Sequence, residues 1–182
     1  MDNLRFIRAT MERAGSFTAV PGYGGVLMGG TALIAAAVAA RQPTDLRWLM
    51  VWVGCAAIAV AIGAAAMALK ARRTSDLLAA PGRRFALSFV PPILAGAVLT
   101  IALLDRGAFE LMPGVWLLHY GLAVAAGGML SVRAVPIMGF CFLFLGAIAI
   151  LGEGIPRDLI LATGFGLFQV GFGAWIARHH GG

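Results

Sequence analysis

The sequence predicts an all-α, polytopic membrane protein: a six-transmembrane-helix bundle with an N-terminal amphipathic interfacial helix. Three observations predict this class. The chain is 60% hydrophobic and only 12% charged, whereas soluble globular proteins are about 45 to 50% apolar and about 25% charged. Six stretches of 18 or more residues contain no Lys, Arg, Asp or Glu. The segments between these stretches are too short to hold a soluble domain.

The six uncharged stretches are long enough to cross a bilayer, because about 20 helical residues cover the roughly 30 Å hydrocarbon core. The predicted spans are 22–40, 48–69, 85–104, 111–132, 134–152 and 159–177. Residues 1–182 then form a single membrane domain. Ala37-Val38-Ala39 resembles a signal-peptide cleavage site, but the lead-in of some 21 residues is long for one. We therefore expect the first stretch to be a true span.

Before the first span, residues 2–14 have the pattern of an amphipathic helix. Leu4, Ile7 and Met11 fall on one face, and arginines occupy the others. Arginines next to a membrane are attracted by anionic head groups. We expect this helix to lie on the inner membrane surface as an anchor. A partner-docking or gating role is the alternative.

The basic residues are distributed unevenly between the two sides of the membrane. With the N-terminus inside, the inner segments carry ten Lys and Arg residues and the outer segments carry four, and five of the eight acidic residues lie outside. This asymmetry satisfies the positive-inside rule, so we expect both termini in the cytoplasm. The net charge of +6 then marks orientation rather than binding to nucleic acid.

Three Val-Pro pairs recur near the start of the helices that run from inside to outside: Val20-Pro21, Val90-Pro91 and Val135-Pro136. Three helical hairpins in a parallel repeat would produce this regularity. Alternatively, proline is simply tolerated in the first turn of a helix, where its missing N–H loses no bond. The unequal spacings between the pairs favour the second explanation.

Small residues form stripes along four of the predicted spans. Lipid removes most of the hydrophobic drive between helices, so close packing through small residues has to hold a bundle together. The stripes are Gly25, Gly29, Ala32 and Ala36; Cys55, Ala59 and Gly63; Ser88, Gly96 and Thr100; and Ala162, Gly166, Gln169 and Gly173. We expect these faces to meet neighbouring helices, and surplus faces to bind a second copy or another membrane protein.

A few polar residues interrupt the apolar spans. Counting along the helices puts His119 roughly 12 Å deep in the outer half, Thr100 and Thr163 each about 6 Å from the outer end, and Gln169 near the midplane. These four residues form the candidate substrate or proton site, which opens outward. Its predicted outer rim consists of Glu110, Glu153 and Asp158.

Each of these residues also has a purely structural interpretation. An ionisable residue inside a membrane is a functional candidate because its charged form is costly there. A neutral His119 needs only one interhelical hydrogen bond, however, and Gln169 can simply hold two helices together. The rim acids can form a solvated turn.

The sequence gives no support for an enzyme, a metal site or a cofactor. The two cysteines lie in predicted spans without metal-ligand spacing. Gly22-Tyr23-Gly24 resembles the core of a potassium-channel filter but lacks the preceding Thr-Val. A haem would need an axial pair, and His179 and His180 lie far from His119. No HExxH, GxSxG or Walker lysine occurs, so no catalytic class is indicated.

In hydropathy the chain resembles small six-helix bacterial inner-membrane proteins, including the acid-resistance membrane family. The resemblance implies a bacterial inner-membrane location and carries over no site residue. Two function hypotheses follow. The first is a small-solute or ion transporter or channel, favoured by His119 and by glycine-rich, proline-interrupted helices. The second is a non-catalytic membrane subunit or stress-related scaffold that binds another membrane protein or lipid, favoured by the scarcity of polar interior residues.

Overall fold

The structure, a computed structural model, describes the backbone of residues 22–74, 80–129 and 131–180 and the side chains of 22–69, 83–129 and 131–180. Every element in these ranges is helical, which confirms the predicted all-α class. The elements are α2 (Gly22–Ala39), α3 (Asp45–Thr74), α4 (Ala80–Asp105), the 3-10 turn η1 (Phe109–Leu111), α5 (Met112–Gly128), α6 (Ala134–Leu151), α7 (Arg157–Leu161), the π-helix η2 (Ala162–Phe168) and α8 (Gln169–His180). The amphipathic helix predicted over 2–14 lies outside the described residues.

Six helical stretches of the described chain are long and apolar enough to cross a membrane. They are Gly22–Ala39, Asp45–Leu69, Arg83–Asp105, Phe109–Gly128, Ala134–Leu151 and Arg157–His180. The sixth span joins α7, η2 and α8 end to end. Each stretch matches one predicted span to within a few residues, and the chain is a multi-pass integral membrane protein.

Local capping explains where the helix starts differ from the prediction. α3 begins at Asp45 because the Thr44 hydroxyl accepts a hydrogen bond from the Arg47 N–H at 3.3 Å, as an N-cap residue does. α4 begins well before Phe85, so Pro91 and Pro92 lie inside it. The first-turn explanation of the Val-Pro pairs therefore holds for Pro136 in α6 but not for Pro91.

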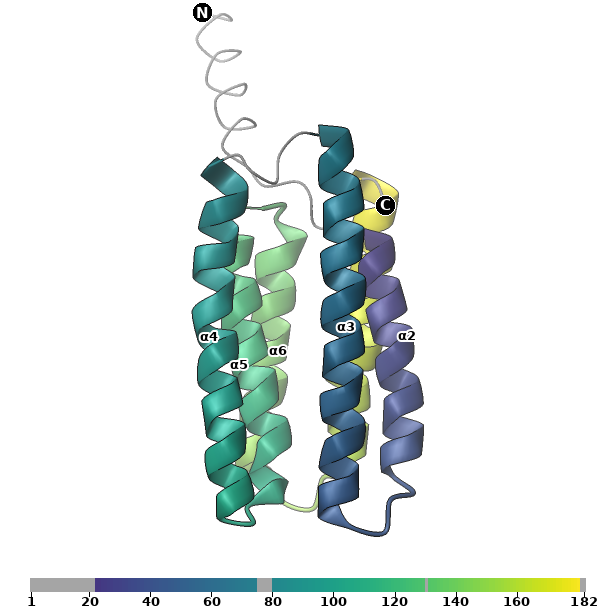
Figure 1. The fold of residues 1–182 in the computed structure, drawn as a ribbon, viewed down its shortest axis with the longest axis vertical. Coiled ribbons are helices and arrows are strands. Elements are labelled where there is room, and N and C mark those ends of the chain that lie inside the picture. Colours follow the sequence, from purple (N-terminus) through teal and green to yellow (C-terminus); the bar gives the residue numbers. More distant parts are fainter. Residues whose placement is uncertain (1–21, 75–79, 130, 181–182) are drawn as a thin grey trace, which may run out of the picture.

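The six spans pack as two groups of three (Figure 1). α2 packs against α3 and against η2 and α8, whereas α5 packs against α4 and α6. We term these the α2 group (α2, α3, α7, η2 and α8) and the α5 group (α4, α5 and α6). The two groups meet mainly where the sixth span contacts α5 and α6. α3 and α4 are the two spans with the smallest buried share, so most of their surface is left for lipid.

Both ends of the described chain lie at the same end of the bundle, because Gly22 packs against the backbone of Ala177. We term this the terminal end and the opposite one the far end. Two tight turns at the far end depend on glycine: Gly107 has φ of 67° and Gly154 has φ of 72°. Residues that carry a Cβ rarely adopt such positive φ angles.

Glycines bring the helix backbones of each group into direct contact. A Cβ at Gly29 of α2 would lie 2.7 Å from the Gly166 carbonyl oxygen and 2.8 Å from the Val170 nitrogen of the sixth span. A Cβ at Gly139 of α6 would lie 2.8 Å from the Ala125 Cα of α5. The small-residue stripes of the first and sixth spans were predicted to meet neighbouring helices, and the structure shows that they face each other.

The second and third predicted stripes also meet neighbours. A Cβ at Gly63 of α3 would lie 3.4 Å from the Met28 sulfur of α2, and one at Gly96 of α4 would lie 3.1 Å from the His119 Cβ of α5. In both groups, small residues thus allow neighbouring helices to approach each other closely.

We expect Gly29→Ala to lower the free energy of unfolding by about 1 to 3 kcal/mol, because its methyl group would meet backbone atoms that have no room to shift. Gly30→Ala is the matched control, since no atom lies within 4 Å of a Cβ at Gly30. Unfolding of both variants in mixed detergent micelles measures the difference. Equal stability of the two variants would contradict the predicted contact between α2 and η2.

Candidate functional site

His119 lies in the contact between α4 and α5, inside one helix group. It is half-buried and packs against Gly96. Its Nδ1 lies 2.8 Å from the Val115 carbonyl oxygen one turn earlier. Because a carbonyl oxygen only accepts, the Nδ1–H is the donor. The ring therefore has a partner on its own helix.

The two candidate threonines lie in different places. The Thr100 hydroxyl donates to the Gly96 carbonyl at 2.8 Å and accepts from the Trp116 indole N–H at 2.8 Å. The Thr163 hydroxyl donates to the Leu159 carbonyl at 2.9 Å. The structure thus brings Thr100 and His119 to one contact around Gly96, while Thr163 lies apart on the sixth span.

Gln169 connects the two helix groups and is the most deeply buried polar side chain of the predicted site. It begins α8, and only 6% of it is exposed. Its Nε2 donates to the Tyr120 hydroxyl of α5 at 2.9 Å. Its Oε1 is buried and has no hydrogen-bond partner among the described residues. A buried unpaired acceptor costs about 1 to 3 kcal/mol, so an isolated one calls for an explanation beyond stability.

Aromatic rings from three other elements enclose Tyr120. Its ring centroid lies 4.8 Å from that of Phe142 on α6, 5.3 Å from that of Phe165 on η2 and 6.3 Å from that of Phe89 on α4. Phe168 of η2 meets Phe142 edge-on at 5.8 Å. The hydroxyl and the amide are therefore polar groups in apolar surroundings, where hydrogen bonds are stronger than in water.

A π-helical segment leads directly into Gln169. π-helices are rare, usually a single turn long, and often found at functional sites. In η2, Gly164 packs against Leu117 of α5 and Gly166 packs against Leu33 of α2. The segment thus packs against α2 in its own group and also contacts α5 of the other group.

At the far end, Asp158 of α7 links the sixth span to α3 within the α2 group. Its Oδ1 accepts hydrogen bonds from the indole N–H groups of Trp48 at 2.8 Å and Trp52 at 3.1 Å, both on α3. Trp48 is fully buried and stacks on Trp116 of α5, with ring centroids 5.6 Å apart. Asp158 is half-buried, and its carboxylate is engaged by the protein itself.

Arg157 extends these contacts to two further acids. Its Nη1 lies 2.7 Å from Asp45 Oδ1 and 3.6 Å from Glu110 Oε1. Its Cζ also lies 4.3 Å from the centre of the Trp48 ring. Glu110 and Glu153, both named in the predicted outer rim, are exposed. We term the set of Asp45, Trp48, Trp52, Trp116, Arg157 and Asp158 the far-end network.

Sequence reasoning missed Tyr120 and the tryptophans. Tyr120 follows His119 directly, so its side chain points about 100° away around the helix and reaches a different neighbour. A signal for the far-end network was present, because Trp48 and Trp52 share one helix face near a membrane boundary. A buried indole N–H usually finds an acceptor.

We expect Asp158→Ala to lower the free energy of unfolding by about 1 to 3 kcal/mol, because two indole N–H groups lose their acceptor. Asp158→Asn keeps an oxygen at the same position and should lose less. Glu153→Ala, which removes an exposed acid from the same end, is the control. Detergent unfolding followed by tryptophan fluorescence measures all three. Equal effects of Asp158→Ala and Glu153→Ala would contradict this role.

Comparison with known proteins gives no match: no family model fits the chain, and no curated protein or solved structure is significantly similar to it. Within the described ranges, no group of three or more His, Cys, Asp or Glu residues is placed to hold a metal ion. The structure itself therefore defines the class of this protein, a multi-pass membrane bundle with apolar helix surfaces.

Proposed function

We propose that this protein is a non-enzymatic transporter or channel for a small, uncharged solute that forms hydrogen bonds, with Tyr120 and Gln169 at its site. The observation that carries the proposal is the buried Gln169 Oε1, which has no partner among the described residues. Leaving such an acceptor unpaired in apolar surroundings is costly. A solute with an N–H or O–H group would satisfy it.

The chemistry of the pair favours a neutral solute over a bare ion. An amide and a phenol supply both donors and acceptors and carry no fixed charge. In the far-end network, the charge of Arg157 is paired with that of Asp45. Aromatic rings around Tyr120 suit the apolar part of a small organic molecule.

The packing in two groups supports a transport mechanism. Rocking of one helix group against another around a site near the midplane is a common way to alternate access. Here the stacking of Trp48 on Trp116 links the groups at the far end, and the π-helix η2 of the α2 group lies beside the site. Gly164 allows this segment to pack against Leu117 of the α5 group, and Gly166 allows it to pack against Leu33 of α2.

We propose a secondary part in the site for three other predicted residues, His119, Thr100 and Thr163. His119 and Thr100 meet around Gly96, on the helices that carry Tyr120 and its neighbour Phe89. We propose that they position Tyr120 through the α4–α5 contact. Thr163 bonds to its own helix, so we expect it to contribute least.

We also propose that the terminal end faces the cytoplasm of a bacterial inner membrane. Among the described side chains, four arginines lie at each end, and the described carboxylates all lie at the far end. The support for this orientation is the count over the whole sequence, in which the segments of the terminal end carry ten Lys and Arg residues and those of the far end carry four, as the positive-inside rule requires.

We expect proteoliposomes that contain the protein to equilibrate urea or glycerol faster than empty liposomes. Gln169→Leu should slow this flux about tenfold, since it removes one hydrogen bond to the solute. The same change should alter the free energy of unfolding little, because removal of the unpaired Gln169 Oε1 offsets the hydrogen bond that the Tyr120 hydroxyl loses. Stopped-flow light scattering after an osmotic shock measures the flux.

Two variants separate the site from its surroundings. Thr163→Val should leave the flux unchanged, whereas His119→Ala should lower it less than Gln169→Leu does. If wild-type protein gives no flux above empty liposomes, or if Gln169→Leu transports normally, the proposal is wrong. If His119→Ala leaves stability, flux and its pH dependence unchanged, His119 is not part of the site.

A second candidate function is binding to another membrane helix, either in a second copy or in a different protein. The observation that favours it is a stripe of small residues on the exposed face of α3: Gly54, Ala57, Ala61 and Ala65. Their spacing puts them on one helix face. Small residues in lipid allow a partner helix to approach closely.

We expect this face to support a complex in mild detergent that Ala61→Leu disrupts, because a larger side chain keeps the partner helix at a distance. Ala97→Leu, on the exposed surface of α4, is the matched control. Light scattering coupled to size-exclusion chromatography measures the mass. A wild-type protein that is monomeric and brings down no other membrane protein would contradict this candidate.

A further inference from the structure

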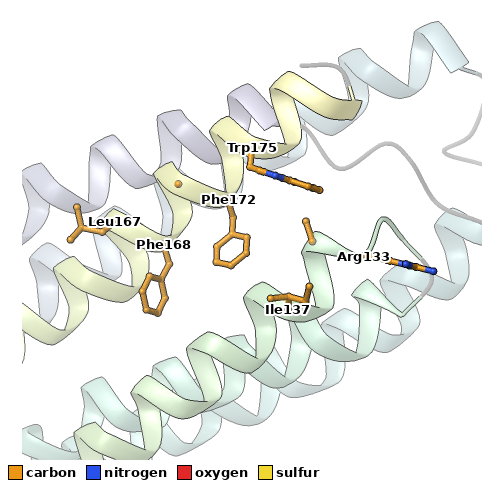
Figure 2. Close-up of a pocket in the computed structure, with 8 residues that line it drawn as sticks. Arg133, Ile137, Leu167, Phe168, Phe172 and Trp175 are labelled. Atoms are coloured by element: carbon orange, nitrogen blue, oxygen red, sulfur yellow. The ribbon is translucent and has the colours of Figure 1, made fainter.

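A groove on the membrane-facing surface separates α6 from the sixth span at the terminal end (Figure 2). It has a volume of about 530 Å³ and is lined by Ile137 of α6 and by Phe168, Gly171, Phe172 and Trp175 of the sixth span, with Arg133 at one end. The groove exists because α6 and α8 contact each other only briefly. Gly171 also contributes no side chain to fill it.

The groove continues toward the middle of the membrane. A second hollow of about 430 Å³ shares Ile137 and Phe168 and extends to Phe144. Along α6, the distance from Arg133 to Phe144 is about 16 Å at 1.5 Å per residue. One leaflet of the hydrocarbon core is about 15 Å thick. An apolar groove of this length matches the acyl chain of one lipid in one leaflet.

Cationic side chains are placed where the head group of such a lipid would lie. Arg133 extends from the groove toward the terminal end (Figure 2). On α8, Arg178 follows Gly171 by seven residues, so the two residues share one helix face. No Asp or Glu lies at the terminal end within the described side chains. The charge at the end of the groove is therefore complementary to a phosphate.

Trp175 marks the depth at which the head group would begin. Tryptophan is enriched at the boundary between hydrocarbon and head groups. The Trp175 ring stacks on His179, with centroids 4.7 Å apart, and lines the same groove as Arg133. The apolar lining and the cations thus meet at the membrane interface.

We propose that the groove between α6 and the sixth span binds one anionic phospholipid, with an acyl chain against Phe168 and Phe172 and the phosphate at Arg133 and Arg178. The acyl-chain pair (Phe168 and Phe172) and the phosphate pair (Arg133 and Arg178) are distinct from the proposed solute site at Tyr120 and Gln169. The lipid proposal therefore does not rest on the transport function. Arginine binds phosphate through two parallel charge-assisted hydrogen bonds.

Native mass spectrometry of the detergent-solubilised full chain tests the proposal with phosphatidylglycerol and phosphatidylcholine of identical acyl chains. We expect phosphatidylglycerol to bind more tightly. Arg133→Gln and Arg178→Gln should each weaken it about fivefold and leave phosphatidylcholine unchanged, as removal of one interfacial arginine does. Arg84→Gln, at the same end on α4, is the matched charge control. Inorganic phosphate should not displace the lipid, since it lacks the acyl chain.

Gly171→Leu tests the acyl-chain part of the site. No atom lies within 4 Å of a Cβ at Gly171, and Ala97 is exposed on α4, so neither Gly171→Leu nor the control Ala97→Leu should disturb the fold. Gly171→Leu should weaken the binding of both lipids, and Ala97→Leu should weaken neither. Equal affinity for the two lipids, or equal losses in Arg84→Gln and Arg133→Gln, would overturn the proposal. So would a lipid-free dimer that Gly171→Leu dissociates, because a second copy would then occupy the groove.

Discussion

Close contact between helix backbones is the constraint on which the rest of this structure depends. Lipid gives apolar helices little reason to associate, so dispersion contacts at short range must hold them together. Gly29 against Gly166 and Gly139 against Ala125 provide such contacts within each helix group. Where no such pair exists, between α6 and α8, the helices separate and a groove forms. The packing in two groups follows from where the glycines lie.

Polar and aromatic side chains add contacts both within the α2 group and between the two groups. Asp158 connects α7 to two tryptophans of α3 within the α2 group, and Trp48 stacks on Trp116 of the α5 group. Near the middle, Gln169 of α8 donates a hydrogen bond to Tyr120 of α5. Hydrogen bonds between transmembrane helices contribute only about 1 kcal/mol each. The few polar contacts between the groups therefore add only modestly to the packing that joins them.

The fold could be predicted from the sequence because hydropathy identifies the helices that cross the lipid, and the spacing of small residues identifies the helix faces that pack closely. All six spans were predicted, and so was the presence of small-residue stripes that meet neighbouring helices, but not which stripes face each other. The site was readable only in part. Gln169 was identified by its polarity and depth, but its partner Tyr120 was not, because one residue of difference from His119 turns a side chain to another neighbour. The π-helix was also missed, since a pattern of 100° per residue assumes a regular α-helix.

The length of α6 limits the membranes that suit this protein. α6 begins after Arg133, ends before Gly152 and contains 18 residues, which corresponds to about 27 Å of helix. It is packed closely against α5 at Gly139 and Gly146. A bilayer of about 32 Å, such as one rich in sterols, would leave polar helix ends in hydrocarbon or have to thin around the bundle. Hydrophobic mismatch therefore favours thin bilayers for this protein. Bilayer thickness would then influence how the two helix groups pack against each other.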